Sequence, residues 1–376
     1  MNTTTRMATS SRCKNPGAHI KKPLLASLLA TFGCAALAQS SVTIFGVLDS
    51  TLQRATQGGA SITRLNGNGG NQFSRFGLRG VEDLGGGTSV GFVLDAGLSI
   101  DTGTGGATSA DNVTAQAAGG LLFNRRSTVS AISQDWGEVR LGRDFVPTYW
   151  NLTIFDPFGT AGSGSVNNLA QGALTRSSTI QTAVRASNTI GYFLPALGGF
   201  YGQAMYAFAE NQSNPTAATK NDGRYAAVRL GYAKGPVNVA ASHGSTNLAS
   251  GDVSTSNFAA SYDFGVARAM VQYFRDQKEL VAAPSRSHGW LIGTQIVVGV
   301  GYIPVSYTTV KDNTPAGRSA RQWAAGYVHN LSKRTALYTT YSRIDNKHGA
   351  ALTGGGVPGV ANAAWTGLDL GIRHSF

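Results

Sequence analysis

Apolar and polar residues alternate along short segments of this chain, most regularly in its last segment. From Leu368 to Phe376 the even-numbered residues are mostly apolar and the odd-numbered residues are polar or small. Successive side chains of a strand point to opposite faces, so one face of this strand suits lipid and the other suits water. A strand of about ten residues that ends on an aromatic residue is typical of a tilted membrane strand and its aromatic girdle.

Segments with the same period recur upstream, bounded by clusters of Gly, Asn and Asp. They predict about sixteen strands, at about residues 42–54, 72–81, 88–99, 121–133, 137–145, 184–194, 200–209, 223–233, 236–246, 253–262, 265–276, 286–297, 299–310, 318–330, 334–345 and 363–376. Alternation is imperfect in several of them. Each membrane strand carries only a weak pattern of its own, so the prediction depends on the repetition.

The predicted connections alternate between short and long along the chain. Lys234-Gly235 is a short one, and the polar stretches 101–120 and 146–183 are long ones. In an up-and-down barrel all short turns fall at one rim and all long loops at the other. We therefore expect an all-β fold, a transmembrane antiparallel up-and-down β-barrel of about sixteen strands, which is wide enough to leave an aqueous lumen.

The third long connection, 146–183, is too polar and irregular for another pair of strands. A loop of this length is uncommon unless it is functional. Its aromatic residues, among them Trp150 and Phe155, favour packing against a wall. We expect the loop to fold into the lumen and narrow it, since irregular backbone can line a water-filled cavity. A disordered external loop is the alternative.

Residues 1–38 are typical of a cleaved secretory signal peptide, which leaves 39–376 as the barrel domain. Basic residues precede an apolar run from Leu24 to Leu37, and an A-x-A site ends at Ala38. Translation from Met1 or from Met7 gives the same mature protein. A lipid anchor on Cys34 is the alternative, but an aliphatic residue that such a site requires is absent.

Removal of this segment changes both the cysteine content and the charge. Cys13 and Cys34 are the only cysteines, so the mature chain can hold neither a disulfide nor a thiolate metal site. The segment also holds five of the 31 Lys and Arg residues and none of the 19 acids, so the formal net charge falls from +12 to +7. A positive balance suits an anionic solute or an acidic surface, and export argues against nucleic acid.

Several motifs resemble those of the Gram-negative general porins, which are sixteen-stranded trimeric diffusion channels. The motifs are Ser74–Gly87, which reads SRFGLRGVEDLGGG, Leu122–Arg126 (LFNRR), Val139–Arg143 (VRLGR), Asp156–Thr160 (DPFGT) and the terminal Phe376. They occur in family order from about Ser41 onwards. The resemblance implies a homotrimer in the Gram-negative outer membrane, in contact with lipid and lipopolysaccharide, that passes small hydrophilic solutes and inorganic ions. It also implies recognition of Phe376 by the barrel-assembly machinery.

Such porins place a ladder of arginines on the barrel wall, opposite acids of the third loop. By resemblance Arg75, Arg125 and Arg185 are the rungs and Asp156 is the acid. Arg75 shares a strand face with Gly77 and Arg79, opposite the apolar face, so it is expected to face water. The alternative for Arg75 is a rim charge that meets lipopolysaccharide.

Four further arginines are possible pore-lining residues: Arg79, Arg126, Arg143 and Arg176. Between Pro147 and Thr182 the only acid is Asp156, and Arg176 adds a base. Three or more arginines against one carboxylate leave a positive constriction, which raises the local concentration of anions. We therefore expect a modestly anion-selective pore.

Other classes of protein fit the sequence less well. Asp101-Thr102-Gly103 matches the aspartic-protease triplet but has no second copy, and the histidines lack metal spacing. We therefore expect no enzyme, no cofactor and no metal. A solute-specific channel remains an alternative, but it would need a stacked aromatic track or dedicated ligands. An adhesin-like binding barrel, which would use the external loops, is another.

Overall fold

The computed structural model describes residues 41–67, 69–106, 112, 122–171, 173–174, 182–211, 219–279 and 284–376. All of them belong to one compact unit, Gln39–Phe376. The predicted signal peptide lies outside the described residues, and its boundary at Ala38 stays a prediction. Among the described residues, no helix combines the length and the apolar character needed to cross a membrane.

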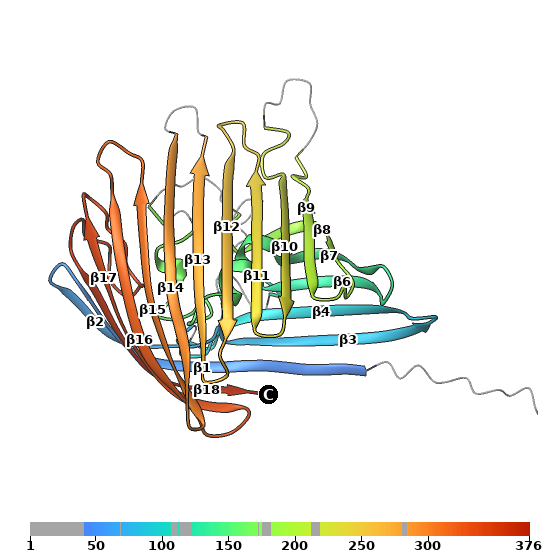
Figure 1. Cartoon of the computed structure of the whole chain (residues 1–376), viewed down its shortest axis with the longest axis horizontal. Helices are drawn as coiled ribbons and strands as arrows, with labels where there is room; N and C mark the ends of the chain where they lie inside the picture. The colour runs from blue at the N-terminus through green and yellow to red at the C-terminus, as the bar shows by residue number, and fades with distance from the viewer. Residues whose placement is uncertain are drawn as a thin grey trace, which may run out of the picture. The chain divides into compact units, whose positions relative to one another are not determined.

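Strands make up most of this unit (Figure 1). They are β1 (Ser41–Gln57), β2 (Ala60–Asn66), β3 (Arg75–Gly85), β4 (Thr88–Ser99), β5 (Thr104–Gly105), β6 (Arg126–Ser133), β7 (Gly137–Phe145), β8 (Arg185–Phe193), β9 (Phe200–Ala207), β10 (Tyr225–Lys234), β11 (Val237–Thr246), β12 (Val253–Asp263), β13 (Ala267–Lys278), β14 (Ser285–Val298), β15 (Gly301–Asp312), β16 (Ser319–Asn330), β17 (Thr335–Lys347) and β18 (Trp365–Ser375).

Sixteen of the described strands form a closed antiparallel ring. Each pairs with the next along the chain, and β1 closes the ring by pairing with both β3 and β18. The other two, β2 and β5, lie within long connections, where β2 pairs with the end of β1 and β5 pairs with the end of β4. The predicted sixteen-stranded barrel is thereby confirmed. The short strands β2 and β5 were not predicted, because they lie within stretches that were expected to be loops.

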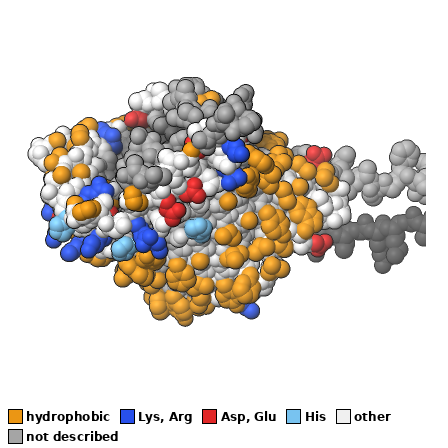
Figure 2. All heavy atoms as spheres, turned by 90° about the horizontal axis from the view of Figure 1, so that it is seen from above, with side chains coloured by type: hydrophobic (Ala, Val, Ile, Leu, Met, Phe, Trp, Pro, Cys, Tyr) orange, Lys and Arg blue, Asp and Glu red, His pale blue; other side chains and the backbone are white. Residues whose placement is uncertain are grey.

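The two faces of each strand meet different surroundings, as β1 illustrates. Asp49, Thr51 and Gln53 point inward and are buried, whereas Leu48 and Leu52 point outward and are exposed. Outward apolar side chains cover much of the flank seen in Figure 2. Such a surface is stable in a hydrocarbon bilayer, where exposed apolar area carries no hydration cost.

The connections alternate between short turns and long loops, as the sequence predicts. The turn between β3 and β4 contains Gly86 and Gly87, whose φ angles of +60° and +75° favour glycine. Two-residue turns with positive φ match the twist of the strands they join. The short turns therefore lie at one rim and the long loops at the other.

The described part of the third long loop, residues 146–171, 173–174 and 182–184, lies inside the barrel and contains the helix α1 (Pro147–Ile154) and the 3-10 helix η1 (Val166–Asn168). Proline in the first turn of α1 suits a helix start, because its missing N–H has no partner there. Leu152, Val166 and Leu169 pack with side chains of the inner wall such as Trp365 in one buried cluster. The expected inward fold of this loop is thus confirmed.

Candidate pore constriction

A cavity of about 540 Å³ lies between the third loop and the barrel wall. Six arginines line it, namely Arg75, Arg79, Arg125, Arg126, Arg268 and Arg373. Among the described residues that line it, the only acids are Asp95 and Asp156. Positive side chains therefore dominate the wall of the cavity.

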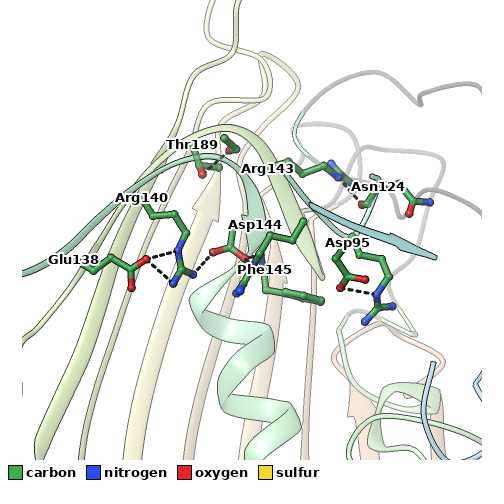
Figure 3. A network of polar contacts seen from close by, with 11 residues as sticks. Asp95, Asn124, Glu138, Arg140, Arg143, Asp144, Phe145 and Thr189 are labelled. Atoms are coloured by element: carbon green, nitrogen blue, oxygen red, sulfur yellow. Dashed lines mark hydrogen bonds and ion pairs between the residues drawn. The ribbon is translucent and has the colours of Figure 1, made fainter. Parts of the chain in front are cut away.

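Arg125 is held in place from three directions. Its Nε lies 3.1 Å from Oδ2 of Asp95, and its backbone N–H donates to the carbonyl oxygen of Asp95. Its guanidinium also contacts two aromatic rings and lies 5.7 Å from the centres of Phe73 and Phe145. Figure 3 shows the ion pair at Asp95, with Phe145 close by at the start of the helix. A guanidinium fixed in this way keeps one orientation at the cavity.

The other two predicted rungs occupy different depths in the wall. Arg75 begins β3, lines the cavity and donates from Nη1 to the carbonyl oxygen of Phe73 at 3.2 Å. Arg185 begins β8, is 7% exposed and lies over the Phe145 ring, 4.4 Å from its centre. The structure therefore brings Arg125 and Arg185 together around one ring, and Arg185 is not among the residues that line the cavity.

Asp156 lies in the loop, but its carboxylate is directed into the loop's own backbone. It accepts hydrogen bonds from the N–H groups of Phe158, Thr160 and Val166 at 2.9 to 3.0 Å, and it is 3% exposed. Burial raises the pKa of Asp156 to about 6, against the lowering effect of the three N–H donors. The carboxylate closes a turn of the loop, and it does not form an ion pair with a described arginine.

The possible pore-lining arginines divide into two groups. Arg79 lies over the Phe45 ring at 5.5 Å and lines the cavity, and Arg126 also lines it but forms an ion pair with Asp144 at 2.8 Å. Arg143 instead donates to the carbonyl oxygen of Asn124 and to Ser187 Oγ, each at 2.7 Å. Arg143 therefore joins the starts of β6 and β8. Arg176 lies outside the described residues.

Asp144 is the centre of a network of charges on β6 and β7 (Figure 3). It accepts hydrogen bonds from Arg126 and Arg140, and Arg140 also pairs with Glu138 at 2.8 Å. An irregularity in the pairing of β7 with β8 falls between Gly142 and Asp144. Such bulges redirect a side chain. This network neutralises the charge of Arg126 and Arg140 at the wall.

Sequence reasoning missed three charged residues of the cavity: Asp95, Arg268 and Arg373. Arg373 donates from Nη1 to Asn71 Oδ1 at 2.7 Å, and Arg268 donates from Nη2 to Ser261 Oγ at 3.2 Å. The alternation of their strands could have placed all three on the inner face. Among the described acids, none forms an ion pair with Arg75, Arg79, Arg268 or Arg373, so these four leave uncompensated positive charge.

Acids and histidines gather nowhere in the part of the chain that the structure describes in a way that could hold a metal ion. The arginines give the water-accessible cavity a positive electrostatic potential. Guanidinium groups attract and orient anions but have no basic or nucleophilic atom for catalysis at neutral pH.

Comparisons with known proteins agree with this geometry. The pattern of the family described as Gram-negative porin matches residues 25–349. Outer membrane porin protein 32 of Delftia acidovorans is 36% identical over 372 residues, which cover 95% of this chain and all of that protein. An outer membrane porin protein of Bordetella pertussis is 28% identical over 413 residues, with 95% of this chain and 100% of that protein covered.

Solved structures give the same result. The anion-selective porin from Comamonas acidovorans has a TM-score of 0.78 at 34% identity, with 90% of this chain and 100% of that chain covered. OmpT of Vibrio cholerae, at 14% identity and a TM-score of 0.61, with 90% of this chain and 99% of that chain covered, shares the fold. The chain therefore belongs to the Gram-negative porins, a family of channels rather than enzymes, and is an outer-membrane general diffusion porin for small hydrophilic solutes.

Proposed function

We propose that this porin favours anions over cations through a constriction lined by arginines. The observation that carries the proposal is the charge of the cavity wall, which six arginines line together with only two described acids, Asp95 and Asp156. A narrow passage with low-dielectric walls concentrates the field of its charges, which raises the local concentration of ions of opposite sign. The similar Comamonas acidovorans porin is described as anion-selective, which supports the same sign.

Within this proposal the named residues have different roles. Arg75 and Arg125 contact the passing anion, and Arg79 contributes to the field at the cavity, whereas Asp144 neutralises the charge of Arg126. Arg185 adds positive charge from behind Phe145. Asp156 stabilises the conformation of the loop and does not determine the potential of the cavity, because its carboxylate accepts hydrogen bonds from three backbone N–H groups.

The test is the reversal potential of the refolded protein in a planar bilayer across a gradient of potassium chloride. The wild type should favour chloride. Arg75→Ala, Arg125→Ala and Arg185→Ala should each lower the chloride-to-potassium permeability ratio, by roughly twofold to fourfold for a charge about 5 Å from the ion in water. Arg321→Ala, on the exposed outer face of β16, is the matched control and should change nothing. A preference for potassium in the wild type would overturn the proposal.

The assembly and the partners belong to the same proposal. We expect a homotrimer that contacts outer-membrane lipid and lipopolysaccharide, is recognised by the barrel-assembly machinery through Phe376, and begins at Gln39 after signal cleavage. OmpT of Vibrio cholerae, which shares the fold, is described in a trimer form. Currents that close in three equal steps and N-terminal sequencing of the exported protein test the subunit number and the cleavage site.

A further inference from the structure

The side of the third loop that faces the cavity is mostly apolar, and the hydroxyl groups of Tyr149 and Thr153, which also line the cavity, are hydrogen-bonded to Thr160 of the same loop. In α1, Trp150, Thr153 and Ile154 line the cavity, and their spacing of three and four residues places them on one face of the helix. Pro157 and Phe158 continue this apolar side beyond the helix. The single acid of this segment, Asp156, is buried in backbone hydrogen bonds. An anion in the cavity therefore has hydrocarbon on the loop side.

Polar contacts on the opposite face of α1 fix this orientation. Asn151 donates from Nδ2 to Asn257 Oδ1 at 2.7 Å and accepts from Arg229 Nε at 3.0 Å. Gln272 donates to the carbonyl oxygen of Leu152 at 2.9 Å. These partners belong to β10, β12 and β13, so the helix is fastened to that sector of the wall and its apolar face is turned toward the cavity.

Most of the cavity arginines lie across the lumen from that sector. Arg75 and Arg79 belong to β3, Arg126 to β6 and Arg373 to β18. In the ring order, β18 to β6 lie halfway round from β10 to β14. The cavity thus has a cationic wall on one side and an apolar wall on the other, with Arg268 of β13 as the exception.

The size of the cavity fits a small organic molecule. Its volume of about 540 Å³ lies within the range of small-molecule sites, which are mostly apolar with a few placed polar groups. The rings of Phe45 and Phe73 also line it, beside Arg79 and Arg125. Aromatic rings stack on other rings and on guanidinium groups.

We propose that the constriction binds aromatic carboxylates as they pass, with the carboxylate on Arg75 and Arg373 and the ring against Trp150. The inference rests on the proposed anion preference, because the carboxylate needs the cationic wall. It goes further in naming the class of solute that both walls recognise. Inorganic anions use only the arginine side, so they pass without being retained.

The test measures how far added solutes reduce the single-channel chloride current. Benzoate should reduce the current at a concentration about tenfold lower than acetate does, because one contact between stacked rings strengthens binding by roughly tenfold. Benzyl alcohol, which has the ring without the charge, should leave the current unchanged. Cyclohexanecarboxylate, which matches the size of benzoate without its π system, should act more weakly than benzoate; an equal effect would overturn the role of stacking.

Variants of Trp150 assign the effect to the apolar wall. Trp150→Leu should weaken the benzoate effect about tenfold and leave the acetate effect unchanged, whereas Trp150→Phe should keep most of it. Trp290→Leu, on the exposed outer face of β14, is the matched control. Heat-modifiable migration on a gel confirms that each variant has folded.

The outcomes separate this inference from the proposed function. A channel that prefers chloride but treats benzoate and acetate alike would overturn the inference and leave the anion preference standing. A channel without chloride preference would overturn the proposed function itself.

Discussion

The guanidinium of Arg185 lies over the face of the Phe145 ring, 4.4 Å from its centre, and Arg125 contacts the same ring at 5.7 Å. Phe145 also packs against Tyr149, nearly parallel at 5.6 Å, and against Trp150 at 5.3 Å. As the last residue of β7, it comes directly before the third loop. One aromatic ring therefore connects two arginines of the wall with the helix of the loop.

Replacing Phe145 with leucine should lower the anion preference, although no charge is removed. Leucine fills much of the volume but has no π face, so Arg125 and Arg185 lose their stacking partner and their fixed positions. We expect a smaller fall in the chloride-to-potassium ratio than in Arg125→Ala, measured as a reversal potential. Phe258→Leu on the exposed face of β12 is the control, and an unchanged ratio in Phe145→Leu would argue against a positioning role.

Replacing Asp95 with asparagine should act in the opposite direction. Asp95 lines the cavity and pairs with Arg125, so its removal leaves one more uncompensated positive charge. The chloride-to-potassium ratio should rise, by roughly twofold to fourfold for a charge about 5 Å from the ion in water. Asp263→Asn, at the exposed end of β12, should have no effect. A fall in the ratio would mean that Asp95 serves mainly to order Arg125.

The stability of the porin should depend on pH through Asp156. Its pKa in the folded state is about 6, above the ordinary value of 3.8. Such a group contributes stability that is fully present below pH 3.8 and is lost as the pH rises through about 6. The unfolding temperature of the wild type relative to Asp156→Asn, measured in detergent, should therefore fall between about pH 4 and pH 7.

The difference in unfolding temperature between the wild type and Asp156→Asn reports on the Asp156 carboxylate alone, because both proteins contain every other buried acid. Phe258→Leu, which removes no titratable group, should show no such dependence relative to the wild type. If the difference rises with pH instead, the three backbone N–H donors outweigh burial and keep the carboxylate ionised.

Gly162 lies where the third long loop contacts the connection between β2 and β3. Its φ angle is +69°, and a Cβ at this position would overlap the carbonyl oxygen of Gly70. Gly162→Ala should destabilise the loop by roughly 1–3 kcal/mol, measured as a lower unfolding temperature and faster proteolysis of the loop. Gly198→Ala, at φ +63° with open space around it, shares the strain but not the overlap. Equal losses in the two variants would exclude the contact as the cause.

The alternation of residues was sufficient to predict the ring of strands, because each membrane strand must meet lipid on one face and water on the other. The same alternation placed Arg75 and Arg79 on the inner face, where they line the cavity. The pairing of Asp95 with Arg125 was not predictable, since it depends on the register between β4 and the start of β6. The carboxylate of Asp156 was read as part of the field because a list of charges does not show that it folds back onto its own loop.

The pairing of β1 with β18 also limits the order in which the molecule can be made. The N–H of Gly46 donates to the carbonyl oxygen of Phe376 at 3.0 Å, and Phe376 donates back to Gly46 at 3.1 Å. One edge of β1, the first strand to be synthesised, therefore stays unpaired until β18, the last strand, has been made. Until then two open edges would face hydrocarbon with unpaired backbone groups, so a partly inserted sheet is unstable. Closure of the ring is therefore a late step that needs the whole sequence from β1 to β18.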